Sequence, residues 1–215
     1  MRTRIKFCGI TRLEDAQAAV ALGVEALGFV LVPQSARFIR AVEAAAIRRA
    51  LPPFVSVVAL LRDADDGFVR EAIATLRPDL LQFHGDESPE QCERYAMPYM
   101  KAVAMAQPQD LAAWSRRYAQ ASALLLDGHD PAGMGGSGKT FDWSRAGGAA
   151  KPLVLAGGLH AGNVADGIRQ LRPYAVDVSS GIEARPGIKD ATKMRAFVAA
   201  VRAVDAQIAS QGSAS

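Results

Sequence analysis

Residues that bind metals or form disulfides are scarce in this chain of 215 residues. It contains two cysteines, Cys8 and Cys92, and three histidines, His84, His129 and His160. None of them belongs to a CxxC, HExxH or EF-hand pattern, so the sequence predicts no metal site. Two cysteines are also too few for the disulfide framework of a small secreted domain.

Long apolar runs and long basic runs are also missing. No apolar stretch reaches the ~18 residues of a membrane span, and the N-terminus has no apolar signal-peptide segment. The net charge is only +3, from 25 basic and 22 acidic residues, without the basic stripe typical of nucleic-acid binders. We therefore expect no membrane and no nucleic acid as partner, and the cytoplasm as the location.

Short β-rich runs alternate with helical stretches along the whole chain. The runs cover residues 4–9, 26–32, 54–61, 80–84, 99–105, 122–127, 152–157 and 175–179. The helical stretches lie at 11–22, 41–51, 65–76, 88–96, 108–120, 142–147, 162–170 and 190–208. This alternation indicates parallel βαβ units. Eight units in a chain of this length predict a single-domain (β/α)8 TIM barrel, with an open doubly wound sheet as the alternative.

Two details of chain organisation follow from local patterns. The first helical stretch opens with Thr11-x-x-Glu14, which predicts a capping box at its N-terminus. The barrel domain is expected to span residues 1–209, and the polar residues 210–215 are expected to form a flexible tail.

The ends of the predicted strands are the expected place of an active site, because active sites of such barrels lie at the carboxyl ends of the strands. Strand alternation places Lys6 and Cys8 on the inner face of the first run, opposite Ile5 and Phe7. A thiol near an ammonium group can have a lowered pKa, which would make Cys8 a usable base or nucleophile. The alternative is a small buried residue without chemistry.

Polar residues end further runs. Asp127 follows three leucines at the end of the sixth run and is either a cap or a catalytic group. Gln82 and His84 share the inner face of the fourth run, where His84 is either a structural residue or a ligand contact. Asp177 points inward from the eighth run, where it either touches a ligand or only supports the strand.

Glycine-rich loops follow the last two runs. Many barrels bind phosphate there, through backbone N–H groups and the N-terminus of a short helix. The candidates are Gly157, Gly158, Ser179, Ser180 and Gly181. Tight turns are the other explanation, but glycines at both expected places favour a phosphate site.

Residues 133–140 (GMGGSGKT) match the P-loop pattern GxxxxGK[ST] letter for letter, which raises a nucleotide-binding protein as a competing hypothesis. The context opposes it. Four residues separate the motif from the preceding run, and Gly147-Gly148 leave little room for the helix that a P-loop opens. The glycine content instead favours a mobile loop that closes over a ligand.

Taken together, five segments make the chain resemble the phosphoribosylanthranilate isomerases over nearly its whole length. They are residues 6–11 (KFCGIT), 82–85 (QFHG), 126–127 with 135–143 (LD and GGSGKTFDW), 155–159 with 163–164 (LAGGL and NV), and 176–183 with 187, 189 and 190 (VDVSSGIE and G, K, D). Each segment alone is unspecific, but five in this order are highly specific. The residues that match the P-loop pattern are a loop of that family.

The resemblance implies a (β/α)8 barrel that catalyses an Amadori rearrangement in tryptophan biosynthesis. The substrate would be N-(5-phosphoribosyl)anthranilate, a small phosphosugar, and no cofactor or metal would be used. Cys8 would be the general base and Asp127 the general acid, while Arg37 resembles the arginine near the anthranilate carboxylate. A guanidinium group suits this role because it can bind a carboxylate in bidentate fashion.

Three alternatives stay open at this level. One is the nucleotide-binding protein, and another is a phosphosugar-binding barrel without this activity. The third is the related isomerase of the histidine pathway, although relatives with dual substrates have an aspartate where Cys8 stands. Members of the family occur as monomers and as homodimers, and the sequence does not distinguish the two.

Overall fold

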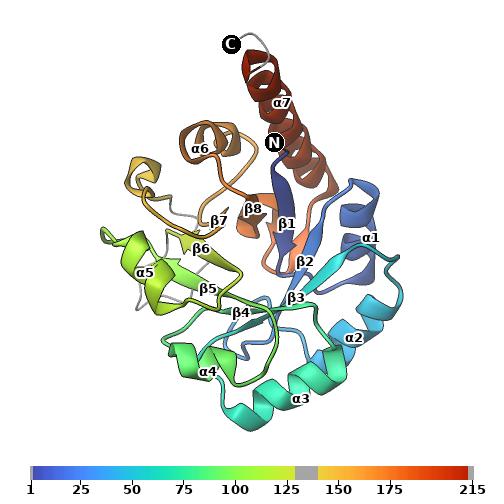
Figure 1. Ribbon diagram of the computed structural model, residues 1–215. Coiled ribbons are helices and arrows are strands. Elements are labelled where there is room, and N and C mark those ends of the chain that lie inside the picture. The colour runs from blue at the N-terminus through green and yellow to red at the C-terminus, as the bar shows by residue number, and fades with distance from the viewer. Residues whose placement is uncertain (1, 129–139, 213–215) are drawn as a thin grey trace.

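The computed structural model describes residues 2–128 and 140–212, and within these residues eight parallel strands close into one barrel (Figure 1). The strands are β1 (Arg4–Cys8), β2 (Ala26–Val30), β3 (Ser56–Leu61), β4 (Leu80–Phe83), β5 (Tyr99–Ala104), β6 (Ala123–Asp127), β7 (Leu153–Leu155) and β8 (Ala175–Val178). Each lies inside the run predicted for it. The barrel closes where β1 pairs in parallel with both β2 and β8, which confirms the predicted TIM barrel.

Helices surround the barrel, as expected for right-handed βαβ connections (Figure 1). They are α1 (Leu13–Ala21), α2 (Ala41–Arg49), α3 (Asp66–Leu76), α4 (Pro89–Glu93), α5 (Leu111–Arg117), α6 (Val164–Leu171) and α7 (Ala191–Gly212), with the 3-10 helices η1 (Trp143–Arg145) and η2 (Ser180–Ile182). After η2, a short antiparallel hairpin of β9 (Glu183–Arg185) and β10 (Ile188–Lys189) precedes α7. None of the helices within the described residues is long and apolar enough to cross a membrane.

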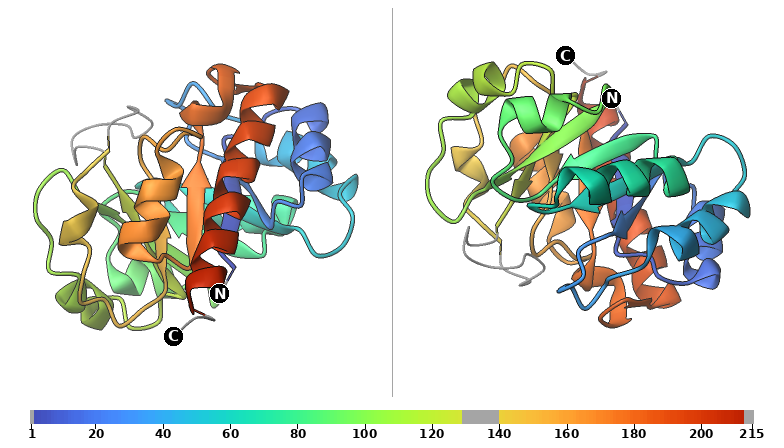
Figure 2. Two further views of the ribbon diagram at one scale, coloured as in Figure 1. Left: turned by 90° about the horizontal axis from the view of Figure 1, so that it is seen from above. Right: turned by 90° about the horizontal axis from the view of Figure 1, so that it is seen from below.

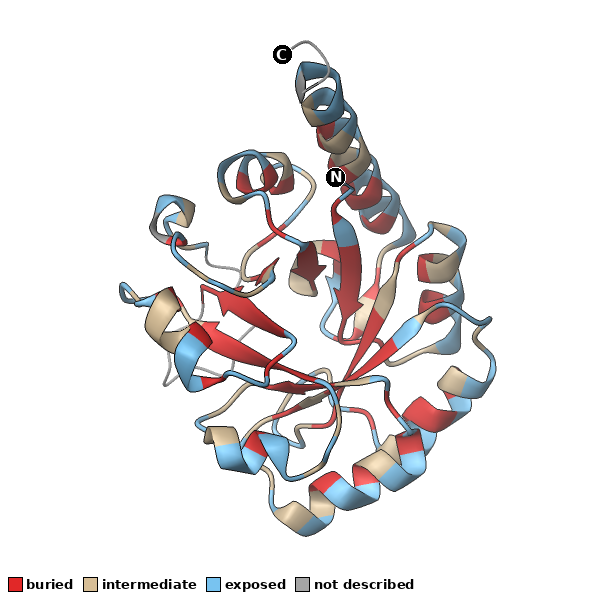
Figure 3. Ribbon diagram, viewed as in Figure 1, coloured by how far each residue is buried: buried red, intermediate tan, exposed pale blue. Residues whose placement is uncertain are grey.

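The two faces of each strand pack into different layers. In β6, Ala123 and Leu125 join side chains of other strands inside the barrel, whereas Leu124 and Leu126 pack against Leu111 of α5. The strands are therefore buried on both sides, and the helices are buried only on the side facing the barrel (Figure 3). Residues at the carboxyl ends of the strands are held by a rigid, close-packed scaffold.

The predicted capping box at the start of the first helix is wrong. The helix begins at Leu13, with Arg12 as its N-cap residue, and no side chain caps it. The Thr11 hydroxyl instead donates to the Gly187 carbonyl in the β9–β10 turn. The Thr11 hydroxyl group, which the capping motif would have used, therefore binds a tertiary acceptor instead. Glu14 forms an ion pair with Arg12.

The last helix, α7, extends further than the sequence pattern indicates. It runs to Gly212, three residues into the segment 210–215 that was expected to be a tail. Good helix formers continue up to Gln211, and Gly212 is the first glycine after Gly187. The helix returns alongside β8 and brings its end close to the start of the chain (Figure 2). There Thr3 donates to Asp205, and Arg202 donates to the Thr3 carbonyl.

Candidate active site

A pocket lies at the carboxyl ends of the barrel strands and gathers most of the residues predicted to have a function. Its lining includes Cys8, Arg37, His84, Asp127, Gly157, Gly158, Asp177, Ser179 and Ser180. Val30, Val32, Leu60, Ala156 and Leu159 give it apolar walls. Residues from opposite ends of the chain therefore meet at one site, and Lys6 and Asp177, 171 positions apart, are in contact below it.

The Cys8 thiol sits above a buried ion pair. Lys6 Nζ and Asp177 Oδ2 are 2.7 Å apart, and their side chains are only 5% and 6% exposed. Burial opposes the charge of Lys6, but Asp177 and Cys8 outweigh it and raise the pKa of the ammonium group. Asp177 Oδ1 is buried and accepts no hydrogen bond from the residues that the structure describes, so it is available to a donor in the pocket.

The expected direction of the Cys8 pKa is wrong. Burial raises the pKa of the Cys8 thiol above its usual value, and the attraction of Lys6 only partly offsets this effect. Asp177 adds to the increase, whereas Lys189 opposes it. The proximity of Lys6 alone suggested a lower pKa, but the charge of Lys6 is already paired with a carboxylate. These effects favour the thiol form of Cys8 at neutral pH.

A glycine on the neighbouring strand makes room for these two side chains. Gly28 of β2 pairs with Cys8 in the barrel. A Cβ atom at position 28 would lie 2.8 Å from Cys8 Sγ, closer than such atoms approach in folded proteins, and 3.0 Å from Lys6 Nζ, which is also a tight contact. The thiol and the ammonium group thus occupy the space that a side chain on β2 would fill.

Across the pocket, His84 links Gln82 to Asp127. The Gln82 amide nitrogen lies 3.2 Å from His84 Nδ1, and His84 Nε2 lies 3.3 Å from Asp127 Oδ2. Because an amide nitrogen only donates, Nδ1 is the acceptor and the ring directs Nε2 at the Asp127 carboxyl group. Both predicted inward orientations, of Gln82 and His84, are confirmed. The arrangement places His84 and Asp127 in contact on the wall opposite β1.

The two glycine-rich loops lie against each other and against Asp127. Gly157 has a φ of +78°, and a Cβ atom there would lie 2.3 Å from the Gly128 backbone nitrogen and 2.6 Å from Asp127 Oδ1. Gly157, Gly158, Ser179 and Ser180 all line the pocket.

Gly181, the fifth residue predicted for phosphate, does not line the pocket in this structure. A Cβ atom at this position would overlap the Leu159 carbonyl oxygen. Its position therefore shows a close contact between the loop after β8 and the loop after β7.

Arg37 reaches the pocket from the loop after β2. Its Nε and Nη2 donate to the two oxygens of Glu183 at 2.9 and 2.8 Å, and this contact raises the pKa of the guanidinium group. Nη1 has no hydrogen-bond partner among the described residues. One edge of the guanidinium group is thus anchored in the protein, which leaves the other edge for a ligand.

Sequence reasoning missed several polar residues at this site. Arg62 lines the pocket directly after β3, and the strand-end rule would have found it two positions beyond Leu60. Glu183 and Lys189 form a buried ion pair of 2.9 Å beneath Arg37, for which the sequence carries no local signal. Among the described residues no group of three or more His, Cys, Asp or Glu could hold a metal ion. The P-loop match lies outside the described residues except for Thr140.

A closed parallel barrel with a polar pocket at the carboxyl ends of its strands defines the chain as a TIM-barrel enzyme. Residues 5–200 match the family model of N-(5'-phosphoribosyl)anthranilate (PRA) isomerase. The chain belongs to this family.

Individual relatives agree over nearly the full length. The N-(5'-phosphoribosyl)anthranilate isomerase of Nitrosococcus oceani is 48% identical, and the alignment covers 95% of this chain and 100% of that protein. The crystal structure of phosphoribosyl anthranilate isomerase from Thermus thermophilus has a TM-score of 0.86 and 40% identity, covering 94% of this chain and 100% of that one. An isomerase in complex with reduced 1-(o-carboxyphenylamino)-1-deoxyribulose 5-phosphate has a TM-score of 0.81 and 35% identity, covering 94% and 99%.

Proposed function

We propose that this chain isomerises N-(5'-phosphoribosyl)anthranilate to 1-(o-carboxyphenylamino)-1-deoxyribulose 5-phosphate in tryptophan biosynthesis, with Cys8 as base and Asp127 as acid. The observation that supports these roles best is that a buried thiol on β1 and a buried carboxyl group on β6 line one pocket. The reaction needs one proton delivered and one removed at different atoms of a small sugar. Two groups on different strands suit that task.

The first step opens the sugar ring. A proton from Asp127 goes to the ring oxygen as the bond between C1 and that oxygen breaks, and the nitrogen lone pair forms the C1=N bond of a Schiff base. His84 Nε2 lies 3.3 Å from Asp127 Oδ2, so the imidazole ring would hold this carboxyl group in place at the pocket. Gln82 orients the imidazole ring for this contact.

The second step moves hydrogen from C2. The Cys8 thiolate removes the C2 proton, and the electrons of that C–H bond form the C1=C2 bond of the enolamine while the nitrogen regains its lone pair. The enolamine then tautomerises to the aminoketose. The raised pKa of Cys8 makes its thiolate a strong base but a minor species at neutral pH.

The remaining pocket residues have binding roles in this proposal. Gly157, Gly158, Ser179 and Ser180 lie where barrels of this class bind phosphate, with Gly181 shaping the loop behind them. Asp177 Oδ1 and His84 would receive the sugar hydroxyl groups. All of these residues come from one chain, so we propose that each copy carries a complete site, whether the protein is a monomer or a homodimer. The cytoplasmic location stays a prediction.

Turnover of the purified chain tests the function. Consumption of phosphoribosylanthranilate is followed by the loss of its anthranilate-type fluorescence, and the carboxyphenylamino product is identified by mass spectrometry. Conversion at a rate far above the spontaneous decay of the substrate would support the proposal. A folded protein that does not change this decay would rule out the proposed activity, and other phosphosugars and nucleotides would then be screened.

We expect Arg37→Lys to weaken binding of the carboxylated substrate. A lysine would pair with Glu183 as a point charge and lose the planar edge that can face a carboxylate. A charged hydrogen bond is worth about 1.5–3 kcal/mol, so KM should rise about tenfold to a hundredfold with a smaller change in kcat. Steady-state kinetics measure both. Arg40→Lys, on an exposed arginine of the same loop, is the control, and an equal KM in both variants would remove Arg37 from the binding site.

We expect Gly28→Ala to damage catalysis more than folding. The added methyl group would push away Cys8 Sγ or Lys6 Nζ, which lie 2.8 and 3.0 Å from its position. A misplacement of about 1 Å at a reacting group can reduce the rate about a hundredfold. The readouts are kcat and the thermal midpoint. Gly147→Ala is a matched control, since its Cβ atom would meet nothing within 4 Å. Wild-type kcat in Gly28→Ala would show that the position of the thiol is not critical.

A further inference from the structure

From Arg37 in the pocket wall a row of three charges runs into the protein, and the proposed reaction gives no role to the two inner ones, Glu183 and Lys189. Arg37 binds Glu183, and Glu183 Oε1 accepts a hydrogen bond of 2.9 Å from Lys189 Nζ. Side-chain exposure falls along this row from 15% at Arg37 to 4% at Glu183 and 0% at Lys189. Two cations and one anion leave a net charge of +1 in a region shielded from water. We call these three residues the charge triad.

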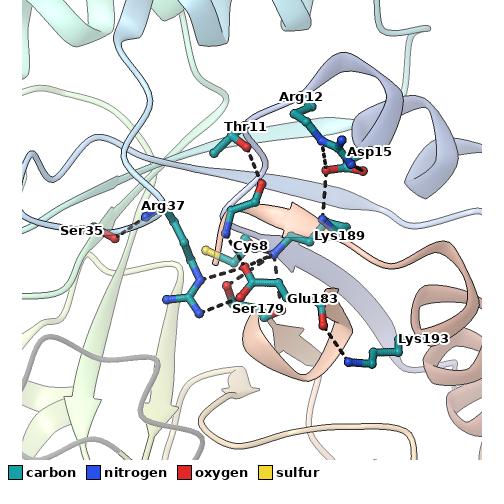
Figure 4. Close-up of polar contacts among 11 residues, drawn as sticks. Cys8, Thr11, Arg12, Asp15, Ser35, Arg37, Ser179, Glu183, Lys189 and Lys193 are labelled. Atoms are coloured by element: carbon teal, nitrogen blue, oxygen red, sulfur yellow. Dashed lines mark hydrogen bonds and ion pairs between the residues drawn. The ribbon is translucent and has the colours of Figure 1, made fainter. Parts of the chain in front are cut away.

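Lys189 connects the triad to the strand ends. Its ammonium group donates to the Cys8 carbonyl at 2.5 Å and to the Ser179 carbonyl at 3.4 Å, in addition to Glu183 (Figure 4). With the Ser179 hydroxyl at 3.5 Å, four oxygen atoms surround this group, and an ammonium group offers them three hydrogens where a neutral amine offers two. Burial lowers the pKa of Lys189, but Glu183 counteracts this effect. The backbone of Cys8 and the loop after β8 are thus held by one cation.

Glu183 accepts hydrogen bonds from both cations of the charge triad, Arg37 and Lys189. Although burial opposes its ionisation, Arg37 and Lys189 keep the pKa of Glu183 below its usual value. In Figure 4 its carboxylate lies between the Arg37 guanidinium group and Lys189, with the Cys8 thiol beside the Arg37 side chain. The charges of Lys189 and Arg37 both interact with the thiol. A change in either member of the Glu183–Lys189 pair therefore changes the charge that Cys8 experiences.

We propose that Glu183 and Lys189 are positioning residues whose buried ion pair holds the Cys8 backbone and the Arg37 guanidinium group in place and sets the charge around the thiol. The part of this inference that concerns catalysis rests on the proposed role of Cys8 as base. The effect on the thiol itself does not, because it depends only on the position of the charges.

Other charged or titratable groups also lie around Cys8, and they are common to all the variants below. They are Lys6 on the same strand, Asp177 on β8, and Arg62, His84 and Asp127 around the pocket. Glu183 and Lys189 are the residues altered in the two test variants, so these groups form a constant background.

The test compares Lys189→Met with Glu183→Gln. Loss of the buried cation should move the midpoint of Cys8 ionisation up by about one pH unit, and loss of the buried anion should move it down by a similar amount. Both variants remove a buried ion pair, so a purely structural role would destabilise both and shift the thiol in the same direction or not at all. The opposite signs separate the two explanations.

The midpoint is measured from the pH dependence of iodoacetamide alkylation, quantified on the peptide that contains Cys8. Using the midpoint rather than the absolute rate removes differences in reagent access, and peptide analysis excludes Cys92. Lys193→Met is the control. Its exposed side chain donates to the Glu183 carbonyl from the same segment, and water screens its charge, so the midpoint should not move.

The outcomes distinguish this inference from the proposed function. Opposite shifts, together with a higher KM in Glu183→Gln from a misplaced Arg37, would support it. Shifts of the same sign, or none in Glu183→Gln, would overturn it even if Lys189→Met fails to fold. Opposite shifts in a protein that does not turn over phosphoribosylanthranilate would retain the charge effect and reject the activity.

Discussion

Replacing Cys8 with alanine is expected to reduce kcat by about 10²–10⁴-fold, the usual contribution of a positioned general base. The barrel should stay folded, because the side chain is small and lines the pocket at the carboxyl end of β1. Cys8→Ser is the control for shape. Its hydroxyl group fills the same space but does not ionise in the accessible pH range, so it should be almost as inactive as the alanine variant. Activity within tenfold of wild type in either variant would exclude Cys8 as the base.

The pH dependence of kcat/KM tests the same role of Cys8, because a base with a raised pKa predicts the direction of the change. A base must be deprotonated to act, and burial raises the pKa of Cys8 above its usual value. The thiolate fraction therefore grows about tenfold for each pH unit from neutrality towards that pKa. We expect kcat/KM to rise with pH over this range, because this parameter reports groups of the free enzyme. A profile that is flat between pH 7 and 9 would mean that another group, or a thiol with a lowered pKa, removes the proton.

Cys8→Asp extends this argument. A carboxylate at position 8 is ionised at neutral pH, so the variant should lose the alkaline rise and retain more activity at low pH than Cys8→Ala. It would also be a weaker base than the thiolate, so its maximum rate should fall below that of the wild type. An unchanged alkaline rise in this variant would assign the titration to a residue other than Cys8.

The sequence predicted the barrel well because its signals are local and repeated. In β6, the alternation of Ala123 and Leu125 with Leu124 and Leu126 serves two apolar layers, so the whole run is apolar and easy to recognise. The strand-end rule then made Cys8 and Asp127 candidates without knowledge of any contact, and the family resemblance supplied the roles proposed for them. Helix termini were predicted less well, as Thr11 shows: its capping motif is correct locally, but the Gly187 carbonyl is a tertiary competitor.

Long-range electrostatics could not be predicted in this way. The contact of Lys189 with Cys8 joins residues 181 positions apart and depends on the hairpin of β9 and β10 folding against β1. The direction of the Cys8 pKa was missed for the same reason. Spacing places Lys6 beside the thiol, but only the fold shows that Asp177 pairs with Lys6 and that burial outweighs the remaining attraction.

Replacing Asp127 with asparagine is the second change with a large expected effect. The amide has nearly the same shape, but it cannot deliver a proton to the ring oxygen, so ring opening would depend on water or on His84. We expect kcat to fall by about 10²–10⁴-fold, as for the loss of a general acid. Because the proton is needed only as the C–O bond breaks, KM should change much less than kcat.

Binding of a product analogue distinguishes a catalytic role of Asp127 from a structural role. Reduced 1-(o-carboxyphenylamino)-1-deoxyribulose 5-phosphate has no ring oxygen to protonate, so the asparagine variant should bind it with an affinity close to that of the wild type. Titration calorimetry measures the affinity, and Arg37→Lys, which should lose affinity for the same compound, is the contrasting control. If Asp127→Asn loses affinity as strongly as it loses kcat, then Asp127 shapes the pocket rather than donating the proton. His84 then becomes the candidate acid, since it lies 3.3 Å from the same carboxyl group.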